Sequence, residues 1–287
     1  MPELPEVETI VRELRKKIIG LKITGVWVDP ARPVNTGHGA GWAKIKKELK
    51  SKKILSVRRR AKYIIMDIEG AKTLFIHQKI SGHLLYGKWT LARRSSEAKA
   101  ATWISQISGP LRDDRQNGYI RFILYLSNGY QVGLSDLRRF GKVILADDDK
   151  VKDLKEIANL GPEPLEISPK AFEGLFTPST GLRAGKKKGR LKQVLMDPTF
   201  IAGIGNIYAD EILWASGLHP LSRVENLDKK DIRKIYGNTV KILKKAIKHK
   251  GSSVDDYRMP SGEKGSFQDI RNAYQLTGEK CKKKDGG

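Results

Sequence analysis

Apolar residues in the first half of the chain fall in short runs that are separated by Gly, Asn and Asp. Short runs bounded by turn residues are typical of β-strands. We interpret as strands residues 23–28, 53–60, 62–68, 73–78, 120–126 and 142–146. The pattern therefore predicts a β-rich domain in this half of the chain.

The first twenty residues follow a helical period instead. Their apolar positions recur every three or four residues, which places them on one face of a helix: Val7, Ile10, Val11, Leu14 and Ile18. Pro5 suits the first turn, because its missing N–H leaves no hydrogen bond unmade there, and Glu3 and Glu6 complement the helix dipole. We expect a helix that packs on the β-rich domain and ends near Gly20.

The second half of the chain is helical in pattern, after a segment at 147–165 that reads as a linker with a short helix. The helix candidates are residues 170–176, 189–196, 208–216 and 228–249. Asp228 is the expected N-cap of the last one, and Gly251 lies past its end. Its predicted buried face consists of Ile232, Ile235, Val240, Leu243 and Ile247. Its lysines form either a solvated face or a phosphate contact, and the pattern leaves both open.

Two segments fit neither period. Residues 87–118 are polar and aperiodic apart from two tryptophans, so we interpret them as an inserted loop. Residues 251–267 are rich in Gly, Ser and charged side chains, a composition that predicts a flexible loop.

The charge balance narrows the class of partner. The 287 residues favour about two domains, and 39% hydrophobic residues fit a globular chain. Lys and Arg total 55 against 32 Asp and Glu, a formal charge of +23 that indicates a polyanionic partner. Nucleic acid is the first candidate and an anionic membrane surface the alternative. No run approaches the length of a membrane span and no signal peptide precedes the first helix, so we expect a soluble, unexported protein.

Cysteine usage agrees with a reducing compartment. Cys281 is the single cysteine, which excludes an internal disulfide and fits the cytoplasm.

Pro2 carries chemistry that the helix start does not explain. Aminopeptidases remove Met1 when the next residue is small, so the mature chain should begin with a proline bearing a free secondary amine. An α-amino group titrates near neutrality and is then a nucleophile. Once it has added to the anomeric carbon of a sugar, a secondary amine forms an iminium with no N–H to lose, and this cation acts as an electron sink. Glu3 is placed to protonate a leaving oxygen if burial raises its pKa.

Three further stretches suit contact with nucleic acid. In RRRAKY (58–63), Lys62 holds a phosphate or simply ends a solvated strand, two readings of similar weight. SDLRRFG (135–141) places two arginines and a phenylalanine on a turn, where an aromatic wedge can enter a duplex. AGIGNIYADEILWASGLHP (202–220) gives a tight turn whose backbone N–H groups, at a helix start, bind a phosphate.

Together these motifs resemble the bacterial formamidopyrimidine-DNA glycosylase family (Fpg/MutM), within the endonuclease VIII-like superfamily. The resemblance rests on PELPEVET, the lysine of RRAKY, DLRRFG, LGPEPL and MDPTFIAGIGNIYADEILWASGLHP, which span residues 2–220, and continues more weakly to Cys281. It implies an α+β fold: an N-terminal β-sandwich with an N-terminal helix, followed by a helix-two-turn-helix domain. The implied boundaries are 2–146 for the catalytic domain, 147–165 for the linker, 166–265 for the DNA-binding domain with a lesion-closing loop at 251–267, and 268–287 for the start of a zinc-finger region.

The resemblance also assigns roles to residues near the N-terminus. Pro2 is implied as the Schiff-base nucleophile and Glu3 as the proton donor at the sugar ring oxygen. Lys62 matches the family's phosphate-binding lysine, which donates a proton during elimination. Glu6 is implied in the pocket near the flipped nucleotide.

Residues implied in DNA binding lie further along the chain. Asn206 matches the asparagine of the two-turn element, and Arg138 and Phe140 match the wedge pair. Ile80 stands where the family commonly has the third wedge residue, a methionine. The remaining implied DNA contacts are Arg139 and Tyr274.

The family also implies one structural Zn²⁺, although the chemistry needs no cofactor. A structural zinc site needs four ligands, and Cys281 occupies the position of the first with no other cysteine in the chain. Cys281 alone cannot hold zinc, so either the chain is truncated or the protein lacks the finger. We expect weaker DNA binding than with a complete finger, because phosphate contacts are lost.

The function implied is base-excision repair of damaged double-stranded DNA by a bifunctional glycosylase and AP lyase. It would remove oxidised purines such as 8-oxoguanine and formamidopyrimidines, then cleave the strand by β,δ-elimination, as a monomer in a bacterial cytoplasm at the nucleoid. An endonuclease VIII type enzyme for oxidised pyrimidines is an alternative, against which Leu4 argues because that type usually has glycine there. A DNA-binding relative without activity is a further alternative, in which Pro2, Glu3 and Lys62 would be unneeded. Leu137 replaces the family's proline, which changes the stiffness of the wedge loop.

Overall fold

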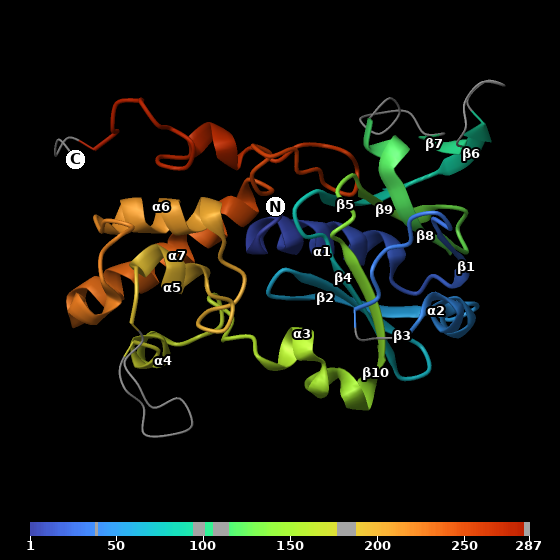
Figure 1. The fold of residues 1–287 in the computed structure, drawn as a ribbon, viewed down its shortest axis with the longest axis horizontal. Helices are drawn as coiled ribbons and strands as arrows, with labels where there is room; N and C mark the ends of the chain where they lie inside the picture. Colours follow the sequence, from blue (N-terminus) through green and yellow to red (C-terminus); the bar gives the residue numbers. More distant parts are fainter. Residues whose placement is uncertain (38–39, 94–100, 106–114, 177–187, 284–287) are drawn as a thin grey trace.

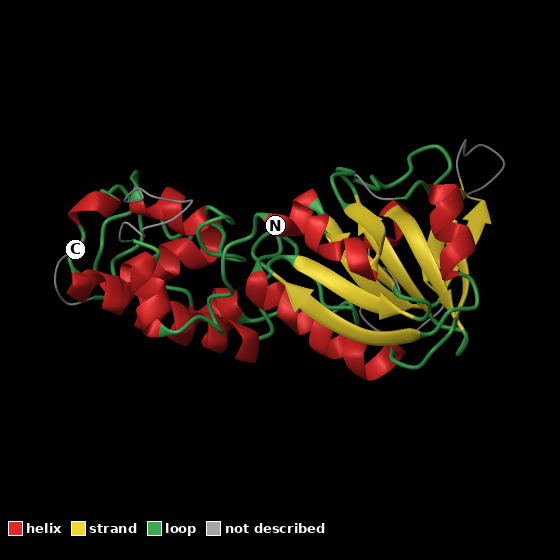
Figure 2. Cartoon of the chain, turned by 90° about the horizontal axis from the view of Figure 1, so that it is seen from below, coloured by secondary structure: helices red, strands yellow, loops and turns green. Residues whose placement is uncertain are grey.

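The protein, seen in a computed structural model, has its strands gathered at one end and most of its helices at the other (Figures 1 and 2). The structure describes residues 1–37, 40–93, 101–105, 115–176 and 188–283. Helix α1 (Leu4–Ile18) begins between the two ends and continues into the strand-rich end (Figure 1). The N-terminus therefore lies where the two ends meet, which we call the junction.

The strand-rich end contains two four-stranded antiparallel sheets. One has the order β1 (Ile23–Val28), β8 (Ile120–Leu126), β9 (Gln131–Asp136), β5 (Gly82–Gly87). The other has the order β10 (Lys142–Asp147), β4 (Lys72–His77), β3 (Tyr63–Ile68), β2 (Ile54–Arg60). Apolar side chains from both sheets, α1 and α2 (Trp42–Leu49) form one core. The predicted α+β class and the six predicted strands are confirmed.

Three elements of this end escape the sequence pattern. Strands β5 and β9 are buried along nearly their whole length, so their side chains do not alternate between apolar and polar. Each also contains glycine, which reads as a turn. Helix α2 has only Ile45 and Leu49 as fully buried positions, too few for a recognisable period.

The interpretation of residues 87–118 as a loop is wrong in part. Strands β6 (Trp89–Arg93) and β7 (Ala101–Ser105) pair as an antiparallel hairpin, which projects from the strand-rich end (Figure 1). A 3₁₀ turn follows at Arg115–Tyr119. Strand pairing uses backbone groups, so it needs no apolar alternation in a hairpin outside the main core. The rest of this predicted loop, 94–100 and 106–114, lies outside the described residues.

The helical end follows a linker that contains a 3₁₀ turn and α3 (Lys155–Ala158), as predicted. Its helices are α4 (Pro169–Gly174), α5 (Leu191–Met196), α6 (Asn206–Ser216) and α7 (Lys229–Lys248), which confirms the helix candidates. The N-cap prediction also holds, since Asp228 Oδ1 accepts a hydrogen bond from the Asp231 N–H at 2.7 Å. The predicted buried face of α7 is wrong at Val240, which is half-buried while Thr239 is buried.

Helix α1 belongs to both ends of the molecule. Leu4 packs in the core of the helical end with Ile204 and Tyr208, while Val7 and the later apolar residues of α1 pack among the strands. The first turn of α1 is therefore fixed by the helical end and the remainder by the sheets.

The segment 251–267 has no helix or strand before a 3₁₀ turn at Phe267–Ile270, but composition is misleading about its flexibility. Tyr257 and Met259 are 4% and 3% exposed and lie in the core of the strand-rich end. The backbone of Phe267 also bonds back to Gly251. Buried side chains hold this segment across the junction, where the N-terminus lies.

Candidate active site and nucleic-acid interface

Glu3 is the central side chain at the junction. It stands immediately before α1, yet its carboxylate lies against the start of α6, where it accepts hydrogen bonds from the N–H groups of Gly205 and Ile207, both at 2.8 Å. The side chain is 2% exposed. Burial raises the pKa of Glu3 to about 7, and repulsion from Glu6 adds to the rise, while Lys62 and the α6 N–H groups oppose it. A carboxyl with this pKa can give and take a proton near neutrality.

Glu6 joins three segments at the junction. Its carboxylate accepts hydrogen bonds from the Tyr208 hydroxyl at 2.5 Å, from the Ser252 N–H at 2.7 Å and from the Glu3 N–H at 2.8 Å. Burial raises its pKa. Glu6 thus ties α1 to α6 and to the segment 251–267, and through Ser252 it reaches the wall of the narrow pocket described below.

Lys62 enters the junction from the turn between β2 and β3. A side chain on Gly205 would come within 2.6 Å of the Lys62 Nζ and 2.5 Å of the Glu3 Cδ, which shows how closely both side chains approach that glycine. Burial lowers the pKa of Lys62, and the carboxylates of Glu3 and Glu6 partly offset the fall. The structure therefore brings together the predicted acid and the predicted lysine.

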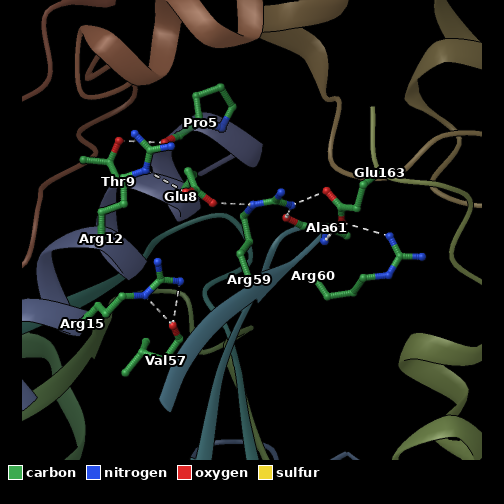
Figure 3. Close-up of polar contacts among 10 residues, drawn as sticks. All are labelled: Pro5, Glu8, Thr9, Arg12, Arg15, Val57, Arg59, Arg60, Ala61 and Glu163. Carbon is green, nitrogen blue, oxygen red and sulfur yellow. Dashed lines mark hydrogen bonds and ion pairs between the residues drawn. The ribbon is translucent and has the colours of Figure 1, made fainter. Parts of the chain in front are cut away.

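A buried ion network fixes the turn that carries Lys62 (Figure 3). Glu163, in the LGPEPL segment, accepts hydrogen bonds from Arg59 Nη1 at 2.5 Å, Arg60 Nη1 at 2.9 Å and the Ala61 N–H at 2.6 Å. Arg59 also pairs with Glu8 of α1 at 3.0 Å. Ala61 has a left-handed backbone (φ 52°), a conformation that costs a non-glycine residue energy and needs such support.

The N-terminus opens onto a cavity. Pro2 is buried and lines a narrow pocket, which adjoins a cavity of about 430 Å³. Met1 lines both spaces, and its amine pairs with Asp255 at 3.4 Å. The larger cavity is lined by Met1, Ile80, Ser81, His83, Tyr119, Leu137, Arg138, Asp255 and Asp256. The predicted nucleophile and two of the predicted wedge residues thus lie around connected spaces.

The predicted wedge residues form an exposed apolar surface on two adjacent loops. Ile80 and Phe140 are 45% and 55% exposed, and Leu137 is similarly exposed. Buried Asp136 joins the loops, because it accepts hydrogen bonds from the Ser81 hydroxyl and the Gly141 N–H, both at 2.7 Å. Arg138 and Arg139 are exposed beside these residues. Exposed large apolar side chains next to arginines are suited to insertion between the bases of a nucleic acid.

Asn206 and Tyr274 meet at the other side of the junction. Asn206 is exposed as the first residue of α6, and its side chain hydrogen-bonds the Tyr274 hydroxyl. Tyr274 is 8% exposed, and its backbone N–H donates to buried Glu211 at 3.0 Å. Tyr274 therefore supports Asn206 from within the helical core.

The residues present do not fit a structural zinc ion. Cys281 is an exposed free thiol, and the described part of the chain holds no group of three or more His, Cys, Asp or Glu that could bind a metal. Also within the described residues, no helix has the length and apolar character to cross a membrane.

Comparison with known proteins decides the family. Residues 1–143 match the formamidopyrimidine-DNA glycosylase N-terminal domain, and residues 160–258 match the formamidopyrimidine-DNA glycosylase H2TH domain. The chain belongs to the formamidopyrimidine-DNA glycosylase family. Membership places it among the DNA glycosylases of DNA repair.

Individual relatives are similar over nearly the whole chain. The formamidopyrimidine-DNA glycosylase of Pelotomaculum thermopropionicum is 33% identical over 100% of this chain and 95% of its own length. A Lactococcus lactis formamidopyrimidine-DNA glycosylase mutant, solved with DNA containing Fapy-dG, has a TM-score of 0.79 and 30% identity, and the match covers 100% of this chain and 92% of that one. The same Lactococcus enzyme in complex with abasic-site DNA gives a TM-score of 0.78 at 29% identity, over 99% and 92% of the two chains.

Three supporting residues are not indicated by the sequence. Glu163 belongs to a motif that carries the family resemblance, but nothing in that motif indicates that its carboxylate would reach the Lys62 turn. Tyr208 reads as a core aromatic, and its hydroxyl contact with Glu6 depends on the fold. Asp136 begins DLRRFG and reads as a turn residue.

Proposed function

We propose that this protein is a bifunctional DNA glycosylase and AP lyase that removes oxidised purines from double-stranded DNA and uses Pro2 as its nucleophile. The observation that carries the proposal is the buried Glu3 carboxyl, with a pKa of about 7, next in sequence to Pro2 and beside Lys62. The groups needed to open a sugar ring are an acid, a cation and an amine. Glu3, Lys62 and the Pro2 amine that forms when Met1 is removed would supply them at the junction.

The chemistry would proceed through Pro2 once Met1 is removed. The Pro2 nitrogen attacks the anomeric carbon of the damaged nucleotide, and the base departs with the bonding electrons and takes up the N–H proton that Pro2 loses. Protonated Glu3 gives its proton to the ring oxygen as the ring opens, which leaves an iminium on Pro2. The iminium withdraws electrons, so a proton is lost from the adjacent sugar carbon and the phosphate is eliminated.

Lys62 serves the phosphate side of this reaction in the proposal. Its cation faces Glu3 and Glu6 across the junction, and its lowered pKa suits a group that donates a proton to a leaving phosphate. The network around Glu163 supports this role, because it holds the turn that carries Lys62.

DNA binding would use both sides of the junction. Ile80, Arg138 and Phe140 form the wedge, with Arg139 beside them, and Asn206 grips the backbone at the start of α6. The charge of +23 supports the partner, since phosphates are neutralised by Lys and Arg. We propose that the enzyme acts as a monomer in a bacterial cytoplasm, in contact with the nucleoid.

Borohydride trapping tests the proposal directly. The protein, shown by intact mass to lack Met1, is incubated with a duplex that carries 8-oxoguanine opposite cytosine, and borohydride reduces any iminium to a stable bond. We expect a covalent complex whose peptide map ends at Pro2, and no complex with Pro2→Gly on the same timescale. Trapping at a lysine, or none at all, contradicts the proposal and favours the DNA-binding alternative.

Oxidised pyrimidines are the second candidate substrate. The wild-type Lactococcus lactis enzyme, with a TM-score of 0.78 and 30% identity to this chain, has also been solved with DNA that contains an oxidised pyrimidine. The trapping assay therefore includes a duplex with an oxidised pyrimidine. Faster trapping on that duplex than on 8-oxoguanine would reassign the substrate class while leaving the Pro2 chemistry intact.

A further inference from the structure

The N-terminal amine of the chain has a carboxylate partner that belongs to a distant segment. The Met1 amine lies 3.4 Å from Asp255 Oδ2, across a separation of 254 residues. Asp255 stands in the segment 251–267, which buried Tyr257 and Met259 fix against the strand-rich end. The partner is therefore held in place by packing and not by its own chain neighbours.

Asp255 also faces the residue that becomes the N-terminus after processing. Pro2 and Asp255 line the same narrow pocket. The amide nitrogen of Pro2 is three bonds from the Met1 amine, so it lies within about 7 Å of the Asp255 carboxylate as a geometric upper limit. When Met1 is removed, the Pro2 nitrogen becomes the N-terminal amine, and it lies within about 7 Å of the Asp255 carboxylate.

The other charged groups around Pro2 are engaged elsewhere. Glu3 accepts hydrogen bonds from α6, and Glu6 accepts them from Tyr208 and Ser252. Asp256 pairs with Arg258 at 3.0 Å. The titratable and charged groups that line the two spaces with the N-terminus are His83, Tyr119, Arg138, Asp255, Asp256 and Tyr257, while Glu3 follows Pro2 directly and has Lys62 beside it. Among these, Asp255 is the carboxylate that already pairs with the terminal amine.

We propose that Asp255 is a positioning residue that pairs with the Pro2 ammonium of the processed chain and holds its nitrogen at the pocket until the ammonium loses its proton. This inference rests on the proposed role of Pro2. An N–H bond of the Pro2 ammonium then breaks, and the proton passes to solvent water. The electron pair stays on nitrogen and then makes the bond to the anomeric carbon.

The sign of the pH effect follows from the charges. A carboxylate near an ammonium stabilises the charged form, so Asp255 raises the pKa of the Pro2 amine. Asp255→Asn should therefore lower that pKa. The acidic limb of the trapping rate then moves to lower pH, because the free amine forms at lower pH.

The pKa of the Pro2 amine can be read without any reaction. Protein labelled with ¹³C-proline and freed of Met1 is titrated by NMR, and the proline whose carbon shifts follow the amine is assigned with Pro2→Gly. We expect the midpoint to fall in Asp255→Asn and to be retained in Asp255→Glu. Asp269→Asn removes an exposed carboxylate just beyond the same segment and should leave the midpoint unchanged.

The pH dependence of borohydride trapping is then measured on the same four proteins. A lower midpoint with a displaced acidic limb in Asp255→Asn alone supports the inference. Equal midpoints in Asp255→Asn and Asp269→Asn overturn it, even if trapping at Pro2 proceeds. Failure of the unsubstituted protein to trap contradicts the proposed function instead, because the NMR midpoint still reports whether Asp255 acts on the amine.

Discussion

Glu3 has a pKa of about 7, so its protonated fraction falls as the pH rises through neutrality. If protonated Glu3 opens the sugar ring, the single-turnover rate on a damaged duplex should decline above about pH 7. Glu3→Gln, which keeps the shape and loses the proton, should reduce the rate by about 100-fold or more. Rates measured from pH 5 to 9 check this, and an alkaline limb that persists in the residual activity of Glu3→Gln would contradict it.

The same shift makes a separate contribution to stability. The pKa of Glu3 is higher in the folded protein than its usual 4.5, so the folded state binds the proton more tightly and loses stability as the pH rises from about 4.5 to 7. The shift corresponds to about 3 kcal/mol. Urea unfolding should show this loss in the unsubstituted protein and not in Glu3→Gln, while the contribution of Glu6 is common to both.

Gly205 is required by close approach at the site. A Cβ there would lie 2.5 Å from the Glu3 Cδ and 2.6 Å from the Lys62 Nζ, so Gly205→Ala must displace both groups. We expect about 1–3 kcal/mol of destabilisation and a loss of roughly 100-fold in the single-turnover rate.

Gly237→Ala is the matched control for this substitution. Gly237 lies in α7 with open space around it, and alanine should stabilise a helix interior there by about 1 kcal/mol. Comparable losses of activity in the two variants would mean that glycine content, and not the contact at Glu3, is responsible.

At the scale of elements, Glu163 connects the linker to the turn between β2 and β3. It is 7% exposed and faces Arg59, which is equally buried. Glu163→Gln removes one of the two carboxylates that face buried Arg59 and leaves it Glu8 alone, so we expect about 1–3 kcal/mol of destabilisation. The elimination step should also slow, because the Ala61 N–H loses a charged acceptor next to Lys62.

Glu173→Gln provides a surface pair for comparison. Its partner Arg233 has a 69% exposed side chain, and breaking an exposed pair should change the free energy of unfolding by less than about 1 kcal/mol. Urea titrations of both variants check the pair of expectations. Equal effects would show that the Glu163 network is no more than a surface ion pair.

The two wedge loops predict a substitution that affects binding and spares the fold. Phe140 is 55% exposed, so Phe140→Ala should change the free energy of unfolding by less than about 0.5 kcal/mol. If the ring enters the duplex, affinity for lesion-containing DNA should fall by roughly tenfold or more, with a smaller change for undamaged duplex. Fluorescence anisotropy on both duplexes measures this, and equal losses on the two would rule out a wedge.

Most elements could be predicted from the sequence, and the exceptions have physical reasons. Residues 120–126 form an apolar run bounded by turn residues, so the sequence indicates a strand there. Strand β9 is buried at every position and contains a glycine near its centre, so its sequence shows no alternation of apolar and polar residues. The hairpin of β6 and β7 lies outside the main core, so its sequence records no alternation. Segment 251–267 looks like a loop in composition, because the residues that anchor it, such as Tyr257, are few and distant in sequence from their contacts.

For the whole molecule, the charge of +23 predicts a strong dependence of DNA affinity on salt. The logarithm of the affinity should fall linearly with the logarithm of salt concentration, with a slope set by the number of neutralised phosphates. Lys62→Gln should reduce the slope by about one contact. A slope that does not change would place the Lys62 amine away from the phosphates.

The site as a whole was only partly readable in the sequence. Pro2, Glu3 and Lys62 can be predicted as site residues because their chemistry is unusual at those positions and their motifs resemble a known family, and the structure brings Glu3 and Lys62 together. Glu163 was not, because an acidic residue in a linker looks the same whether it is solvated or meets two arginines about 100 positions away. Contacts of that kind form only when distant parts of the chain pack together in the fold.

The contact between Met1 and Asp255 carries a consequence for the order of events during synthesis. The first residues of the chain leave the ribosome many seconds before residue 255 is made. Once the later segment has packed, Pro2 is buried, so a processing enzyme has poor access to the bond between Met1 and Pro2. We therefore expect exposure of the Pro2 amine to depend on timing, with methionine removed from the nascent chain before the last third of the chain folds over its beginning.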